Sequence, residues 1–185
     1  MFAREVAIST VNSGSVVSSG LQAGDLVLMG AVMNMAAFYI MARPEISGVQ
    51  DLKGKRIGVT RLGSSSDFAI REYLKKNQLQ TGRDVNIMQA GGMPELAAAL
   101  NSGSISAAPL SAPSSYVAEQ RGNRVIANLA HEGIYFVIAG LTTTRRFLRE
   151  QRRDAKAFLR AFGRATHFMF EQGDQAKSIL RKYAK

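Results

Sequence analysis

The chain has 185 residues, of which 46% are hydrophobic and 21% charged, a composition that suits one globular domain or two small lobes. It contains no cysteine, which excludes disulfides, thiolate catalysis and cysteine-bound metal clusters, and no apolar run reaches the roughly 18 residues of a membrane-spanning helix. The net charge is +10, and the densest basic run lies between 145 and 164.

Short apolar runs alternate with helical patterns along the chain, which predicts an α/β fold with a largely parallel sheet. In the first part we expect strands at 6–9, 25–29 and 38–42, helices at 15–22 and 31–37, and a connection at 43–51. The central part predicts strands at 56–60, 84–89 and 105–110, followed by helices at 67–77, from 94 to a stop at 103, and from 111 to a stop at 122. The last part predicts strands at 124–129 and 134–141, then basic helices at 145–171, with a break near 153–154, and at 175–182.

The segment from 51 to 76 has the most informative local pattern: a short strand, a Gly/Ser loop and the first turn of a helix. The chain turns between Gly63 and Ser66, and Ser64 has capping-box spacing to Asp67. Backbone N–H groups, three hydroxyls and the positive end of a helix dipole therefore meet at one place, which favours an anion or a polar small molecule. The other interpretation is an ordinary capped helix after a strand.

Three strands of the central part lead into polar or Gly-rich loops before a helix, at 61–66, 90–94 and 111–113. In an open α/β sheet, ligands bind at the carboxyl ends of the strands. Three such loops at one edge predict a binding site there.

The basic run is opposed only by Glu150 and Asp154, and it consists of Arg145, Arg146, Arg149, Arg152, Arg153, Lys156, Arg160 and Arg164. Such a face binds nucleic acid in some proteins and is simply solvated in others. Because no nucleic-acid motif accompanies it, we expect no nucleic-acid partner. The spacing of Phe158, Phe162 and Met169 predicts the buried face of the same helix.

A series of motifs then occurs in a fixed order: DLKGKRIGV, a Gly-Ser-Ser-Ser loop, DVNIMQAGGMPELAAALNSGSISAAPLSAP, and AEQRGNRVIANLA. In this order they resemble the solute-binding proteins of nitrate/sulfonate/taurine-type ABC importers, which share a domain with thiamine-pyrimidine-synthesis proteins. The resemblance implies a class II periplasmic-binding-protein fold, with two α/β lobes, two crossovers and a ligand cleft between the lobes.

By this resemblance the second lobe spans 47–132, a partial first lobe combines 1–42 with 136–185, and the crossover hinges are 43–46 and 133–135. Members of the family have a secretion signal or lipid anchor and a further strand–helix unit before Val6. The sequence has neither, so we expect an incomplete first lobe. The resemblance implies a periplasmic or extracellular, membrane-associated location.

The function implied is non-catalytic capture of a small anionic or polar solute and its delivery to an ABC permease. We expect no catalytic residue, metal or cofactor. The expected ligand contacts in the second lobe are Arg61, Gly63, Ser64, Ser65, Ser66, Asp67, Gly92, Met93, Ser111 and Pro113. Those in the first lobe are Met29 and Asn34.

Other functions stay open. The fold also serves as a ligand-sensing domain in transcription regulators, and the chain could equally be a truncated remnant that binds nothing. A pyrimidine-synthesis enzyme is disfavoured because the cysteine-rich segment of that branch is missing and the two histidines, His131 and His167, are isolated. A lobe without its first strand would expose a sheet edge, which opens a route to self-association.

Overall fold

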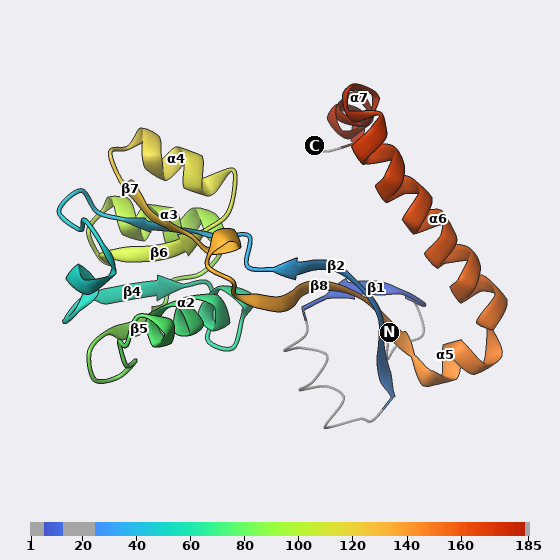
Figure 1. Ribbon diagram of the computed structural model, residues 1–185, viewed down its shortest axis with the longest axis horizontal. Coiled ribbons are helices and arrows are strands. Elements are labelled where there is room, and N and C mark those ends of the chain that lie inside the picture. The colour runs from blue at the N-terminus through green and yellow to red at the C-terminus, as the bar shows by residue number, and fades with distance from the viewer. Residues whose placement is uncertain (1–5, 13–24, 184–185) are drawn as a thin grey trace.

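The computed structural model describes residues 6–12 and 25–183, and Figure 1 shows the arrangement of its elements. The helix expected at 15–22 lies outside the described residues. The strands are β1 (Ser9–Val11), β2 (Leu26–Met35), β3 (Tyr39–Ala42), β4 (Arg56–Val59), β5 (Asn86–Gln89), β6 (Ala107–Leu110), β7 (Arg124–Asn128) and β8 (Tyr135–Thr144). The helices are α2 (Ser65–Lys76), α3 (Met93–Asn101), α4 (Ser114–Gln120), α5 (Arg145–Glu150), α6 (Arg152–Glu171) and α7 (Gly173–Tyr183), with 3-10 turns at Val49–Leu52 and Leu129–His131.

Five strands form a mixed sheet in the order β5-β4-β6-β3-β7. β4 is parallel to β5 and β6, whereas β3 is antiparallel to both of its neighbours. Four strands therefore run in one direction, which confirms the largely parallel sheet for this part of the fold. Helix α2 covers one face, and helices α3 and α4 cover the other (Figure 1).

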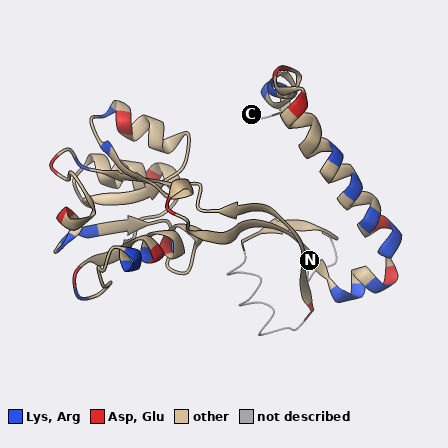
Figure 2. Ribbon diagram, in the orientation of Figure 1, with Lys and Arg blue, Asp and Glu red and all other residues tan. Residues whose placement is uncertain are grey.

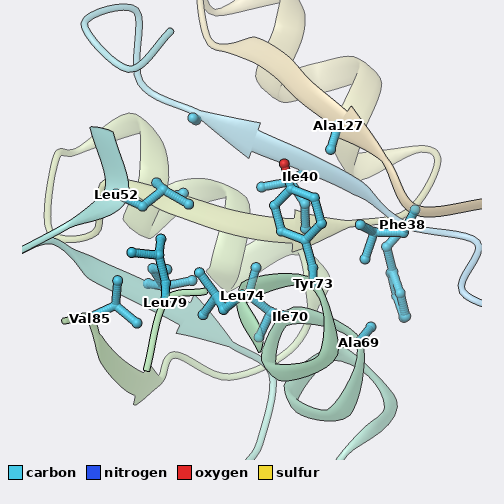
Figure 3. Close-up of a cluster of buried hydrophobic side chains, with 14 of the residues drawn as sticks. Phe38, Ile40, Leu52, Ala69, Ile70, Tyr73, Leu74, Leu79, Val85 and Ala127 are labelled. Carbon is cyan, nitrogen blue, oxygen red and sulfur yellow. The ribbon is translucent and has the colours of Figure 1, made fainter. Parts of the chain in front are cut away.

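Side chains alternate between the two faces of this sheet because successive residues of a strand point to opposite sides. In β3, Ile40 and Ala42 join the cluster under α2, whereas Met41 joins the cluster under α3 and α4. Figure 3 shows the first cluster, to which α2 contributes Ala69, Ile70, Tyr73 and Leu74. Burial in it raises the pKa of the Tyr73 hydroxyl, and the nearby Glu132 carboxylate adds to the shift.

The second described sheet is antiparallel, with β8 between β1 and β2. β2 and β8 have 10 residues each and form a long ribbon that runs from the five-stranded sheet towards the C-terminal helices (Figure 1). Among the described strands, parallel pairing therefore occurs only within the five-stranded sheet.

Two predictions for the first part of the chain are wrong. β2 continues past Gly30 to Met35, where a helix at 31–37 was expected, because β8 pairs with it along this length and supplies its hydrogen-bond partners. The register shifts three times along the pair, so the alternation that identifies a strand in a sequence is broken. The first strand lies at Ser9–Val11 rather than at 6–9, opposite Gly140 to Thr142 of β8.

β3 ends at Ala42, where the predicted lobe boundary lies, and this boundary stays a prediction. β3 lies inside the five-stranded sheet, between β6 and β7, so the chain passes from one sheet to the other between Met35 and Tyr39. The residues predicted as the first hinge, 43–46, directly follow β3, and Ile46 is buried in the core of this sheet. The amide of Ala36 donates a hydrogen bond to the carbonyl of Ile134 at 3.1 Å, so the segment that follows β2 lies beside the segment that precedes β8.

Helices α5, α6 and α7 follow β8, and the break between α5 and α6 falls at Gln151 rather than at 153–154. The predicted buried face of this region is wrong, since 38% of Phe158 and 52% of Met169 are exposed. Among the described residues, α6 contacts mainly α5 and α7, and it extends away from both described sheets (Figure 1). None of the described helices is both long enough and apolar enough to cross a bilayer.

Candidate binding site at the edge of the five-stranded sheet

The loop between β4 and α2 has the conformation that its sequence predicts. Gly63 has a φ of +79°, which glycine adopts without strain, and it turns the chain towards the helix. Ser64 is the N-cap of α2, and its hydroxyl accepts a hydrogen bond from the amide of Asp67 at 3.4 Å. The helix therefore begins two residues earlier than expected, at Ser65.

Three hydroxyls of this loop form a closed triangle. The oxygens of Thr60, Ser64 and Ser66 lie 2.9 to 3.0 Å from one another. The Ser66 hydroxyl also accepts a hydrogen bond from the amide of Thr60 at 3.1 Å, and Ser66 is only 1% exposed. Because each edge of the triangle uses one hydroxyl proton, these three groups hold the loop together.

Other groups of the loop have hydrogen-bond donors that the triangle does not use. The first backbone N–H groups of an α-helix have no acceptor within the helix, which leaves those of Ser65 and Ser66 directed out of its N-terminus. Ser65 is half-buried and its hydroxyl is outside the triangle, and Arg61, four residues earlier in the chain, is exposed. These groups can donate hydrogen bonds to a negatively charged oxygen while the triangle stays intact.

Asp67 stabilises the loop through its carboxylate. Its carboxylate accepts hydrogen bonds from the amide of Gly63 at 2.8 Å and from Nε of Arg71 at 2.7 Å. Nη1 of Arg71 donates in turn to the hydroxyl of Thr81 at 3.0 Å. Both carboxylate oxygens are thus engaged inside the protein, and Arg71 balances the charge that would otherwise repel an anion. The predicted contact between Asp67 and a solute stays a prediction.

The other two predicted loops lie at the same edge of the sheet, because β5, β4 and β6 are adjacent and parallel. Gly92 is the N-cap of α3, and a Cβ there would lie 2.7 Å from a carboxylate oxygen of Glu95. Met93 is half-buried and packs against both core clusters. Ser111 is half-buried and its carbonyl accepts a hydrogen bond from the amide of Ser115, while the neighbouring Pro113 is exposed at the start of α4.

The structure does not bring all predicted residues together. Met29 and Asn34 lie on β2 in the antiparallel sheet, where Met29 is half-buried and Asn34 is exposed. Both sit where the pairing with β8 is irregular. The strand-end loops thus share one edge of the five-stranded sheet, and Met29 and Asn34 lie on a separate element.

Thr60 was missed as a member of the loop. A hydroxyl at the last position of a strand, directly before a serine-rich turn, is the signal that could have identified it. Sequence alone did not reveal its partners, because the triangle forms only when the turn folds back on the strand.

Three cavities of the described part lie elsewhere and are lined by none of the predicted ligand residues. Their volumes are about 370, 630 and 350 Å³. The first includes Asp84, whose carboxylate has a pKa below its ordinary value because the amide of Gln80 donates to it and Arg83 lies beside it. The third lies where α2 meets the start of β8, next to the Phe68 and Phe136 rings, whose centroids are 4.5 Å apart.

The described residues include no group of three or more His, Cys, Asp or Glu side chains that could hold a metal ion.

A family model described as NMT1/THI5 like matches residues 3–176, so the chain belongs to this family. No curated protein matches the chain.

Solved structures share the fold over almost the whole chain. The alkanesulfonate-binding protein SsuA of Xanthomonas axonopodis pv. citri, bound to MOPS, is 19% identical with a TM-score of 0.80, over 98% of this chain and 63% of that one. The periplasmic aliphatic sulphonate binding protein SsuA of Escherichia coli is 20% identical with a TM-score of 0.81, over 97% of this chain and 58% of that one. The Candida albicans CA3427 gene product, which has the generic periplasmic binding protein fold, is 15% identical with a TM-score of 0.72, over 98% of this chain and 60% of that one.

These likenesses establish a periplasmic-binding-protein fold, as the sequence predicts. The chain spans about three fifths of the length of the matched proteins.

Proposed function

We propose that the chain captures a small organic anion, such as a sulfonate, as the solute-binding part of an ABC importer. The observation that carries this proposal is the cluster of three strand-end loops, with the N-terminus of α2 and the Ser65 hydroxyl at its centre. The family and the sulfonate-binding proteins of the same fold support the class of solute.

In this proposal the loop residues have separate roles. Thr60, Ser64 and Ser66 hold the loop in shape, and Asp67 with Arg71 anchors it. The sulfonate oxygens accept hydrogen bonds from the first N–H groups of α2 and from the Ser65 hydroxyl, and Arg61 adds positive charge. The loops at 90–94 and 111–113 form the other walls of the site.

We further propose that the two sheets belong to two lobes, with β3 assigned to the second lobe and the paired crossovers at 36–38 and 129–134 acting as the hinge. Closure of the lobes about such a hinge would bring Met29 and Asn34 towards the strand-end loops and exclude water from the solute. The chain then acts by binding and release without chemistry. An ABC permease is the proposed partner and the periplasm the proposed location.

Isothermal titration calorimetry with MOPS, a short alkanesulfonate and nitrate tests the proposal. We expect saturable binding of a sulfonate that Ser65→Ala weakens by about tenfold or more, because hydrogen bonds to charged groups contribute about 1.5–3 kcal/mol. Ser104→Ala is the matched control, since Ser104 is an exposed serine in the turn after α3, away from this edge of the sheet. Absence of saturable binding in a cooperatively folded sample would refute the proposal, and so would an equal loss in the control.

A further inference from the structure

A polar cavity lies at the edge of the five-stranded sheet opposite to the strand-end loops, where β4 and β5 begin. Its volume is about 370 Å³, within the roughly 300–1,000 Å³ of small-molecule pockets. The lining comes from the residues before β4, the C-terminal end of α2 and the loop before β5. All lining residues lie between 50 and 84, so none belongs to the antiparallel sheet or to the C-terminal helices.

The lining of this cavity is mainly basic. Lys53, Lys76 and Arg83 contribute to it, and Asp84 is the acidic residue. Figure 2 shows basic positions at the start of β4, at the end of α2 and in the loop before β5. Nζ of Lys76 is already engaged, since it donates to the carbonyl of Glu132 at 2.7 Å and to its carboxylate at 2.9 Å. Lys53 and Arg83 therefore remain as the cations for a ligand.

Asp84 orients Arg83 and leaves most of its donors unused. The Asp84 carboxylate accepts hydrogen bonds from the amide of Gln80 at 2.9 Å and from Nε of Arg83 at 3.2 Å, so both of its oxygens are engaged. The amide of Gln80 is the main reason why the pKa of Asp84 lies below its ordinary value, and the carboxylate therefore stays charged. Arg83 is held through Nε alone, and its two Nη groups keep their N–H donors for a ligand.

Lys53 lies close to the same group. Its positive charge, like that of Arg83, lowers the pKa of Asp84, so both cations act on one place at the cavity. The Lys53 ammonium makes no hydrogen bond or ion pair with the part of the chain that the structure describes. Two cations with unused donors thus line one cavity, whose only carboxylate already has its partners.

The C-terminal end of α2 would repel an anion if its carbonyl groups were free. Donors within the chain reduce this repulsion. The amide of Leu79 donates to the carbonyl of Leu74 at 2.9 Å, as in a Schellman motif. Nδ2 of Asn77 donates to the carbonyl of Tyr73 at 2.8 Å, and Nε2 of Gln50 donates to the carbonyl of Asn77 at 3.2 Å. An anion beside this helix end therefore meets carbonyls that are already hydrogen-bonded.

We propose that this cavity binds a phosphate group between Lys53 and Arg83. The planar guanidinium of Arg83 suits two oxygens of a phosphate, and the ammonium of Lys53 adds a point charge. A phosphate ester carries a charge of about −1.5 to −2 at pH 7, which matches two cations better than the single charge of a sulfonate does. The proposal uses no residue of the strand-end loops, so it stands or falls independently of the proposed solute.

The test is a titration of the isotope-labelled 185-residue chain with inorganic phosphate and with β-glycerophosphate, in Tris buffer at constant ionic strength. We expect saturable shifts of the amide signals of Lys53 and Arg83, and weaker binding at higher salt. Lys53→Gln/Arg83→Gln should weaken binding at least tenfold, because it removes both cations.

The matched control is Lys55→Gln/Arg121→Gln, which removes one Lys and one Arg at exposed positions that line none of the three cavities. Lys53→Gln alone keeps the contact between Arg83 and Asp84, so it should unfold like the unchanged chain. It should still weaken phosphate binding about fivefold, the effect of one partly solvated charge. Urea denaturation of each variant checks its fold.

Three results would overturn the proposal: shifts at Lys53 and Arg83 that do not saturate, an equal loss of binding in the control pair, or saturable shifts confined to Ser65 and the other strand-end loops. The two probes separate the sources of the phosphate group. Tighter binding of β-glycerophosphate would support a phosphate ester as the ligand, and tighter binding of inorganic phosphate would support the free ion.

Discussion

Ser65 and Ser66 are neighbours in sequence but have different surroundings. The hydroxyl of Ser66 is buried and joins Thr60 and Ser64, whereas that of Ser65 is half-buried and outside the triangle. We therefore expect Ser66→Ala to lower the free energy of unfolding by about 1–3 kcal/mol, because it leaves the Thr60 amide without its acceptor. Ser65→Ala should change it by less than about 0.5 kcal/mol.

Urea denaturation of both variants checks this assignment. Equal stability losses in the two would show that the triangle does not hold the loop. A stable Ser66→Ala variant with impaired solute binding would reverse the two roles.

The sequence predicted which residues form this loop but not the separate role of each one. A run of serines between a strand and a helix indicates a capped turn with free N–H groups, and the structure has such a turn. The pattern could not reveal that Asp67 points into the loop and pairs with Arg71. This pairing depends on the position of Thr81, whose hydroxyl accepts a second hydrogen bond from Arg71.

At the scale of elements, β4 and α3 lie close together because Gly58 of β4 has no side chain. A Cβ on Gly58 would lie 2.5 Å from Cδ1 of Ile105 and 2.6 Å from Cδ1 of Leu96. Gly58→Ala should therefore destabilise the fold by about 1–3 kcal/mol through overpacking. Gly48→Ala is the control, because Gly48 is extended and a Cβ there meets nothing within 4 Å.

Thermal and urea denaturation of the two glycine variants would test this packing. If Gly58→Ala is as stable as Gly48→Ala, the two side chains move aside freely and α3 does not fix the position of β4. Because the loop that follows β4 forms the candidate site, a shift of β4 would also change the site.

Elements with local hydrophobic patterns were predictable, and elements defined by a distant partner were not. α2, α3 and β4 to β7 match their expected positions within a few residues, because each combines an apolar pattern with Gly, Pro or Ser boundaries. The second half of β2 reads as a helix in sequence, but β8, about a hundred residues later, makes it a strand. Likewise, β3 lies in the five-stranded sheet because it pairs with β6 and β7, and the residues around β3 do not indicate this pairing.

At the scale of the whole molecule, α2 connects the candidate site to the crossovers. The loop of the candidate site leads into the N-terminus of α2. At the C-terminus of the helix, Nζ of Lys76 lies 2.9 Å from a carboxylate oxygen of Glu132. Phe68 of the same helix packs on Phe136 of β8. A solute bound at the loop would therefore act on a helix that already touches the proposed hinge, which is the arrangement that lobe closure requires.

We propose that a small organic anion binds at the sheet edge formed by β5, β4 and β6. The most direct test is a titration of the isotope-labelled chain with MOPS, followed by amide chemical shifts in NMR spectra. We expect saturable shifts of the amide signals, concentrated at Ser65, Gly92 and Ser111. Shifts that instead spread without saturation over the basic helices between 145 and 183 would contradict it, because they would show only a diffuse attraction of anions to the charged tail.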